Sequence, residues 1–281
     1  MAYFRHDGQR LAYTVYGEGR RCTVLLPGLL LSQKMQVPLA RRLARLGNRV
    51  ITFDPLGHGA SDRPRDMWRY SMRAFAEQTV ALLDHLELDE AVVGGASLGA
   101  NVTLELAALA PERVRGMLIE MPVLDNAIPA CAAAFAPLLL ALTFGAGPLG
   151  LLARGARAVP RRWVPLLAEV GLDAVSQDPG PSAAVLQGII FGRTAPHRRE
   201  RRQMTAPALI VGHPRDPVHP FSDADMLAHE LPHGRLLHAE SILELRLRPE
   251  RLSAEIGAFI AECWDEPAGR ERRRSRAATA R

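Results

Sequence analysis

Short β-rich runs alternate with helical patterns along most of this chain, and this alternation limits the folds that it can adopt. The predicted strands are residues 23–26, 49–54, 91–95, 113–120, 208–213 and 235–239, and the predicted helices are 32–47, 75–86, 97–110 and 248–262. Strands that alternate with helices are typical of a mostly parallel, twisted sheet with helices on both faces. At the start, residues 3–5 and 10–17 flank a turn and predict an antiparallel hairpin. We therefore expect an α/β fold.

The length of 281 residues is near the upper size for one hydrophobic core, so one large domain with an insertion is expected. The strand pattern stops between residues 122 and 203, where Ala, Leu, Pro and Gly predominate. We expect a core formed by residues 1–121 and 204–264, a helical cap at 122–203, and a tail at 265–281.

Residues 127–153 contain no charged side chain over 27 positions, a length that could cross a bilayer. Prolines and glycines interrupt the stretch, and no second strongly apolar segment accompanies it. A hydrophobic cap over the sheet is therefore favoured over a transmembrane helix. A surface that leans on a membrane stays open as a third interpretation.

The formal net charge of +5 is located in the last residues of the chain. Residues 270–281 hold six arginines and one glutamate, and 6 − 1 = +5 accounts for the whole excess. This tail has no apolar periodicity, so we expect it to be disordered. Arginine content alone gives weak support for a nucleic-acid partner, and we expect none.

The cysteine pattern argues against a disulfide framework or a zinc site, because the three cysteines are few, odd in number and widely spaced. This usage fits a reducing compartment, so a cytoplasmic location is expected. The first residues have no apolar region typical of a secretory signal. No metal-ligand spacing and no dinucleotide glycine fingerprint is apparent, and we expect no cofactor.

The strongest local motif is Gly-Ala-Ser-Leu-Gly at residues 95–99, between a predicted strand and a predicted helix. The pattern alone is weak, but the strand-turn-helix context is what a nucleophilic serine on a strained turn requires. Ser97 would then lie at the N-terminus of a helix, whose N–H groups favour a developing oxyanion. The alternative is that the two glycines only allow helix and strand to pack closely.

With this motif, the chain resembles the α/β-hydrolase superfamily, in its esterase, lipase and haloperoxidase-like branch, over about residues 2–262. FDPLGHGASDRP at 53–64 is similar to a loop of that family, in which His58 would order the loop. LLPGLLLS at 25–32 falls where the family has its oxyanion loop, with Pro27 in the usual histidine position. The resemblance implies an oxyanion hole formed by the backbone N–H groups of Leu29 and Leu98.

The resemblance also implies a catalytic acid and a base. Asp216 occupies the acid position, and Glu120 at the end of 113–120 is a second candidate. In the expected position of the base, before the last helix, the chain has Ile242. His238 is the nearest substitute and is our expected base, although His213 and His219 on either side of Asp216 are also candidates.

Two functions follow from these observations. The first is a serine hydrolase that acts on a small hydrophobic ester or related acyl compound through an acyl-serine intermediate, because an apolar cap would cover the substrate. The second is a protein that retained the fold and its pocket, lost the base, and binds a small apolar ligand. The oligomeric state is left open.

Overall fold

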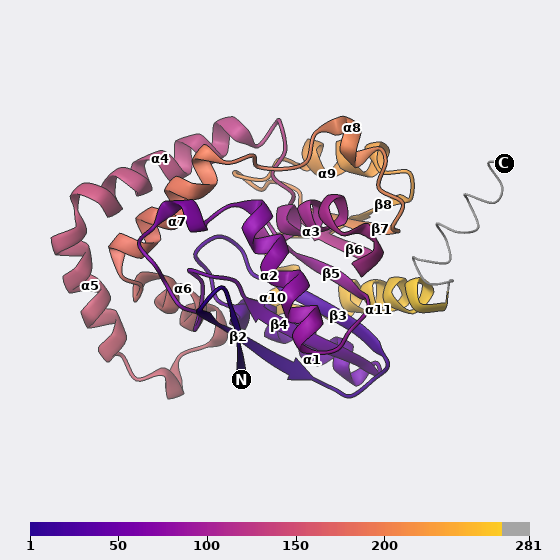
Figure 1. Ribbon diagram of the computed structural model, residues 1–281, viewed down its shortest axis with the longest axis horizontal. Coiled ribbons are helices and arrows are strands. Elements are labelled where there is room, and N and C mark those ends of the chain that lie inside the picture. Colours follow the sequence, from indigo (N-terminus) through magenta and orange to yellow (C-terminus); the bar gives the residue numbers. More distant parts are fainter. Residues whose placement is uncertain (266–281) are drawn as a thin grey trace.

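A single eight-stranded sheet forms the centre of the molecule in the computed structural model, which describes residues 1–265. The strand order is β1-β2-β4-β3-β5-β6-β7-β8 (Figure 1). The strands are β1 (Ala2–His6), β2 (Gln9–Tyr16), β3 (Arg21–Leu26), β4 (Asn48–Asp54), β5 (Ala91–Ala96), β6 (Val114–Glu120), β7 (Ala208–Gly212) and β8 (Gly234–His238). The hairpin β1-β2 is antiparallel and β2 pairs antiparallel with β4, whereas all later pairings are parallel. The predicted hairpin and mostly parallel sheet are therefore confirmed.

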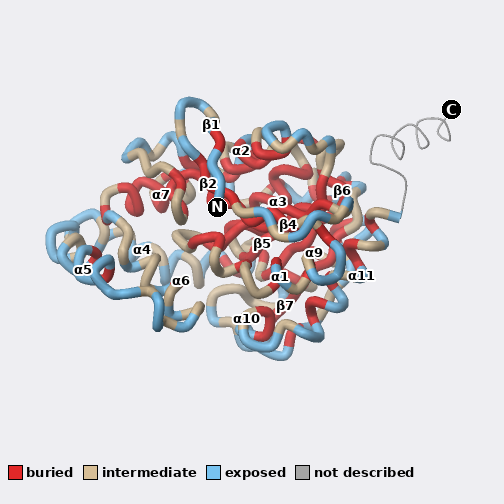
Figure 2. Tube along the Cα trace, turned by 90° about the horizontal axis from the view of Figure 1, so that it is seen from below, coloured by how far each residue is buried: buried red, intermediate tan, exposed pale blue. Residues whose placement is uncertain are grey.

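Helices cover both faces of the sheet and create two apolar clusters. The first cluster contains buried side chains of α2 (Met72–His85), α3 (Leu98–Leu109) and α9 (Phe221–Glu230), and the second contains those of α1 (Val37–Arg45) and α11 (Glu250–Asp265). Short helices η1 (Gln33–Gln36), η2 (Met67–Arg69), η3 (Pro111–Arg113) and α10 (Glu244–Leu247) complete this part of the chain. The buried residues concentrate on the strands and on the sheet-facing sides of these helices (Figure 2).

Further helices lie between β6 and β7, within the predicted insertion 122–203. They are α4 (Ile128–Phe144), α5 (Ala146–Ala158), η4 (Arg161–Trp163), α6 (Leu166–Val175), α7 (Pro179–Phe191) and α8 (Arg198–Arg201). In Figure 1, α4 to α7 extend to the left of the sheet, and α4 packs against α7. We refer to α4–α7 as the inserted helices. The division of the chain into separate domains stays a prediction.

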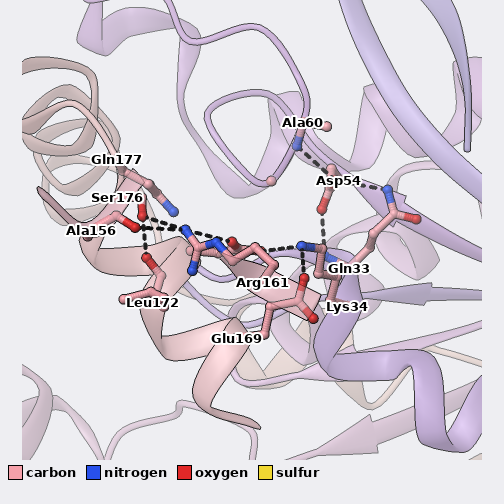
Figure 3. A network of polar contacts seen from close by, with 12 residues as sticks. Gln33, Lys34, Asp54, Ala60, Ala156, Arg161, Glu169, Leu172, Ser176 and Gln177 are labelled. Atoms are coloured by element: carbon pink, nitrogen blue, oxygen red, sulfur yellow. Dashed lines mark hydrogen bonds and ion pairs between the residues drawn. The ribbon is translucent and has the colours of Figure 1, made fainter. Parts of the chain in front are cut away.

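A polar network joins α6 to the segment that follows β3 (Figure 3). The ammonium group of Lys34 lies 2.5 Å from the carboxylate of Glu169 and 2.8 Å from that of Asp173. On the sheet side, the Asp54 carboxylate accepts from the Gln33 backbone N–H at 2.6 Å and from the Gln33 side chain at 2.8 Å. The inserted helices are thereby connected to the end of β4 (Figure 3).

Two expectations concern a membrane and the tail. No single helix of residues 1–265 is long and apolar enough to cross a bilayer; α4 and α5 reach that length and composition only together, and the pair is bent by 95°. The predicted disordered tail at 265–281 lies outside the described residues, apart from Asp265 at the end of α11.

Candidate active site

Ser97 occupies a sharp turn between β5 and α3. Its backbone has φ 54° and ψ −110°, a conformation that few residues with a side chain adopt, and its N–H donates to the Glu120 carbonyl at 2.9 Å. A Cβ at Gly95 or Gly99 would approach the Leu26 carbonyl oxygen to 2.6 or 2.8 Å. Both glycines are therefore required sterically, because β5 and α3 pass directly against β3 at this turn.

The side chain of His219 contacts Ser97 directly. Its Nε2 lies 2.9 Å from Ser97 Oγ, and its Nδ1 lies 3.0 Å from Oδ2 of Asp216. Because the Asp216 carboxylate can only accept, the proton on Nδ1 points to Asp216, and the lone pair on Nε2 faces the Ser97 hydroxyl. This is the geometry of a serine whose proton an imidazole can accept.

Asp216 is held in its charged form. Burial disfavours the carboxylate, but hydrogen bonds from the His219 side chain and from the backbone N–H groups of His219 and Val218 outweigh that cost and lower the pKa of Asp216 to about 2. The side chain is only 6% exposed. Asp216 therefore offers a charged acceptor to the Nδ1 proton of His219.

The structure corrects the expected base, since the imidazole at Ser97 belongs to His219 and not to His238. His238 ends β8, where its ring packs at a tilt of 37° against Phe221 of α9, with 4.6 Å between the ring centroids. The neighbouring β7 pairs with β8 up to Gly212 and His238, so the strand does not end early enough to release that ring. Asp216 and His219 share one loop, with a spacing of three residues that was visible in the sequence.

Leu29 and Leu98, the predicted oxyanion donors, line a cavity together with Ser97. Leu98 is the first residue of α3, a position whose N–H has no partner within its own helix. Leu29 lies in the loop after β3, next to Leu30, which has a positive φ of 57°. The carbonyl of Leu30 accepts a hydrogen bond of 2.5 Å from the side-chain amide of Gln177. The role of the two N–H groups stays a prediction.

The cavity beside Ser97 has a volume of about 260 Å³ and is mainly apolar. α4 and α7 of the inserted helices supply much of its wall, with residues Ile128, Cys131, Ala132, Phe135, Ala136, Leu186, Ile189 and Ile190. Asn101 is a polar exception, but its side chain is occupied by hydrogen bonds with Val123 and Thr194. The cavity thus offers apolar contacts to a ligand whose reacting group reaches Ser97.

A family profile described as the alpha/beta hydrolase fold matches residues 24–167, slightly more than half of the chain. The chain belongs to the alpha/beta hydrolase fold family. The matched range contains the loop after β3, the Ser97 turn and the start of the inserted helices.

Known proteins match shorter stretches of the chain. The chain is 32% identical to a putative non-heme haloperoxidase of Mycobacterium phage D29 over 114 residues, 40% of each chain. It is 41% identical to a 2-hydroxymuconate semialdehyde hydrolase of Pseudomonas sp. (strain CF600) over 71 residues, 25% of each chain. The matches thus span between a quarter and two fifths of these relatives.

Solved structures of the alpha/beta hydrolase fold match over most of the chain. The enol-lactonase of Burkholderia xenovorans LB400 gives a TM-score of 0.74 at 21% identity, covering 92% of this chain and all of that one. An esterase of Thermogutta terrifontis gives 0.73 at 21% identity, with 93% and 97% of the two chains covered. At this identity the likeness concerns the fold.

In this member of the alpha/beta hydrolase fold family, the segment after β8 contributes to a buried cluster of charged side chains. Arg246 donates to both carboxylate oxygens of Glu120 at 2.7 Å, and His213 lies 3.2 Å from the same carboxylate. The other ring nitrogen of His213 lies 2.9 Å from the Ser241 carbonyl oxygen. Burial opposes the charge on Glu120, but Arg246 and His213 lower its pKa to about 2, and Glu120 raises the pKa of His213 despite burial. Glu120, the second candidate acid, thus lies in an ion pair and not at His219.

Two remaining predictions concern His58 and metals. His58 is fully buried, its Nδ1 lies 3.0 Å from the Leu56 carbonyl, and its ring packs edge-on against Phe75. Burial lowers the pKa of His58 to about 4, so the ring is neutral near pH 7. These contacts fit a residue that orders its loop, and that role stays a prediction. Within residues 1–265 no group of three or more His, Cys, Asp or Glu side chains is arranged to hold a metal.

Proposed function

We propose that this protein is a serine hydrolase that cleaves a small hydrophobic ester or related acyl compound. The observation that carries the proposal is the continuous hydrogen-bonded line from Asp216 through His219 to Ser97, with distances of 3.0 and 2.9 Å. A serine hydroxyl near pH 7 is a weak nucleophile unless a base accepts its proton, and this line supplies the base and the group that orients it.

The first half of the reaction forms an acyl-serine. Ser97 Oγ attacks the substrate carbonyl carbon while its proton moves to Nε2 of His219, and the carbonyl electron pair becomes an oxyanion. The backbone N–H groups of Leu29 and Leu98 would stabilise that oxyanion. When the oxyanion collapses, the bond to the leaving alcohol breaks, and the alcohol oxygen takes the proton from His219.

The second half releases the acid. A water molecule gives a proton to His219 and attacks the acyl carbon, and collapse of the second oxyanion breaks the bond to Ser97, whose Oγ regains the proton. Throughout both halves Asp216 stays charged, which stabilises the imidazolium form of His219 without accepting its proton.

The apolar cavity supports a hydrophobic acyl or alcohol group as the part of the substrate that the protein binds. Its lining by α4 and α7 offers no charged side chain to a ligand. The match to a 2-hydroxymuconate semialdehyde hydrolase, at 41% identity over 71 residues, supports a hydrolytic reaction. A cytoplasmic location is part of the proposal and is supported by the three free cysteines.

The alternative of a ligand-binding protein without a base rested on Ile242 in the expected histidine position. His219 removes the main support for that alternative, because its imidazole contacts Ser97 Oγ although position 242 holds isoleucine. The strained turn at Ser97 also argues for catalysis, since binding alone does not require it.

Labelling with a fluorophosphonate probe tests the proposal. We expect the purified protein to be labelled promptly, Ser97→Ala not at all, and His219→Ala at least about 10³-fold more slowly. His238→Ala is the matched control, because that histidine lies near the same sheet edge but contacts Phe221, and it should label like the unaltered protein. A folded protein that resists the probe would refute the hydrolase proposal, and slow labelling confined to His238→Ala would refute the role of His219.

A further inference from the structure

The inserted helices expose apolar side chains that the cavity does not use. The less exposed residues of α4 recur at 131, 135 and 139, and the first two of them line the cavity. Leu140 and Phe144 are four residues apart and lie on another stripe of α4, where they are 58% and 83% exposed. α4 is therefore apolar towards the cavity and also towards solvent, a distribution found in helices that contact lipid or a partner.

The exposed apolar surface continues beyond α4. Leu151 and Leu152 of α5 are 64% and 61% exposed, and Trp163 of η4 is 80% exposed. Figure 2 shows α5 and the adjoining part of the inserted helices as mainly exposed. We call Leu140, Phe144, Leu151, Leu152 and Trp163 the insertion surface. A single exposed leucine is ordinary on a protein surface, whereas five large apolar side chains exposed within 24 residues are more than scattered exposure explains.

The charged residues from position 126 to position 168 are all arginines, while the next acidic residues, Glu169 and Asp173, lie on α6. Residues 126–168 contain four arginines, at positions 154, 157, 161 and 162, and no aspartate or glutamate. Arg154 and Arg162 are exposed, and the guanidinium of Arg162 lies over the Trp163 ring, 5.3 Å from its centroid. Tryptophan and arginine next to exposed leucines are typical of segments that lie in the interface of a membrane with anionic lipids.

We infer that the insertion surface docks on a bilayer that contains anionic lipids. The apolar side chains would enter the headgroup region, and the exposed Arg154, Arg157 and Arg162 would contact lipid phosphates. Arg161 is already paired with Asp173 at 3.6 Å. A second copy of this chain is a poorer partner, because a symmetric contact through the same surface would bring the arginines of both copies together. The bend of 95° between α4 and α5 suits helices that lie along the interface.

Docking at this surface would also give the cavity its substrate. Ile128 of α4 and Ile190 of α7 both line the cavity and are each 50% exposed, so the cavity reaches the outside between these two helices. This opening lies at the N-terminal end of α4, about 18 Å along the helix from Leu140, so an apolar ester that leaves the bilayer surface would have a short path along α4 to Ser97. This supply of substrate rests on the proposed function, whereas the docking itself does not require Ser97.

Flotation of the full chain with vesicles tests the inference. We expect it to float with vesicles of equal parts phosphatidylcholine and phosphatidylglycerol, and much less with phosphatidylcholine alone. Phe144→Asp and Leu152→Asp should each weaken partitioning about tenfold, since each removes a large apolar contact and adds a repelled charge. Leu247→Asp on α10 is the matched control, because Leu247 is as exposed as Leu152, at 61%, and should float unchanged.

Further arms of the experiment distinguish the insertion surface from the Arg-rich tail and from contact with a second copy. Every variant contains the tail, so unchanged flotation of Phe144→Asp and Leu152→Asp would assign binding to the tail and overturn the inference. A concentration-dependent dimer in sedimentation without vesicles, lost in Phe144→Asp and accompanied by no flotation, would overturn it in favour of a second copy. Ser97→Ala should float like the unaltered protein, and a chain that floats but resists the fluorophosphonate probe would refute only the proposed function.

Discussion

The carboxylate of Asp216 lies 3.0 Å from Nδ1 of His219, three residues further along the same loop. In this arrangement the carboxylate fixes the tautomer of the imidazole that faces Ser97. We expect Asp216→Asn to lower ester turnover about 10⁴-fold, because an amide can donate to Nδ1 and favour the unproductive tautomer. Turnover of a short chromogenic ester measures this effect. Asp225→Asn is the control, since Asp225 lies on the exposed side of α9, and an equal loss there would contradict the assigned role.

The buried pair of Glu120 and Arg246 makes stability depend on pH. The pKa of Glu120 in the folded protein, about 2, is below its ordinary value of 4.5, so its contribution is complete above pH 4.5 and is lost as the pH falls towards 2. Glu120→Gln should lower the free energy of unfolding by about 3 kcal/mol at neutral pH and by less below pH 4.5.

Urea unfolding at several pH values measures the effect of Glu120→Gln. His213 faces the same carboxylate and has a raised pKa, so its contribution has the opposite sign and decreases as the pH rises. Below pH 4.5 the difference in the free energy of unfolding between the unaltered protein and Glu120→Gln should therefore decrease as the Glu120 carboxylate takes up a proton. Glu262→Gln, in an exposed pair with Arg235, should change stability little at any pH. A constant difference across the acid range would contradict the prediction.

Gly99 is predicted to tolerate no side chain. A Cβ there would lie 2.8 Å from the Leu26 carbonyl oxygen and 2.9 Å from that of Pro27, so the backbone before Leu29 would have to move. Gly99→Ala should lower the free energy of unfolding by about 1–3 kcal/mol and slow fluorophosphonate labelling. Gly155→Ala is the control, because no atom beyond its chain neighbours and its own helix backbone lies within 4 Å of its Cβ position. The free energy of unfolding should rise by about 0.5–1 kcal/mol. If both substitutions changed the free energy of unfolding equally, the close approach of the Leu26 and Pro27 carbonyls to Gly99 could not be the cause.

Gln177 joins the inserted helices to the loop that holds Leu29. Its amide nitrogen donates to the Leu30 carbonyl at 2.5 Å, and its amide oxygen accepts from Arg63 at 2.7 Å. Gln177→Glu retains the acceptor for Arg63 and removes the donor to Leu30, so we expect kcat to fall about tenfold with a smaller change in KM. Gln203→Ala, at an exposed position, should leave both constants unchanged. Unchanged kinetics of Gln177→Glu would show that the Leu30 contact does not position the loop.

Cys131 offers a chemical probe of the cavity. It lines the cavity with Ser97, whereas Cys22 and Cys263 are buried. Burial, together with the charges of Asp223 and Asp216, raises the pKa of the Cys131 thiol, so reaction with N-ethylmaleimide should be slow at pH 7 and faster at pH 9. The adduct should block fluorophosphonate labelling, and Cys131→Ala should abolish the block. Equal inhibition of Cys131→Ala would place the modified group elsewhere.

The parts of the site that depend on local sequence could be predicted. The Ser97 turn follows from two glycines between a strand and a helix, and the strands follow from their apolar runs. The base could not be predicted in this way, because the position of His219 depends on the path of the loop after β7. That loop turns at Arg215, which has a positive φ of 59°, and no glycine marks the turn. The usual order of residues in the family favours the segment after β8, but there Arg246 forms a buried ion pair with Glu120.

The loop that holds both Asp216 and His219 has a consequence for how the chain could be divided. Ser97, Asp216 and His219 all precede β8. The rest of the described chain, β8 with α10 and α11, contributes apolar packing through Ile256, Phe259 and Ile260, together with the ion pair of Arg246. A break between α9 and β8 would thus separate a fragment with every reacting group from one that only completes the core. Reassembly of two such fragments would switch the reaction on through folding alone.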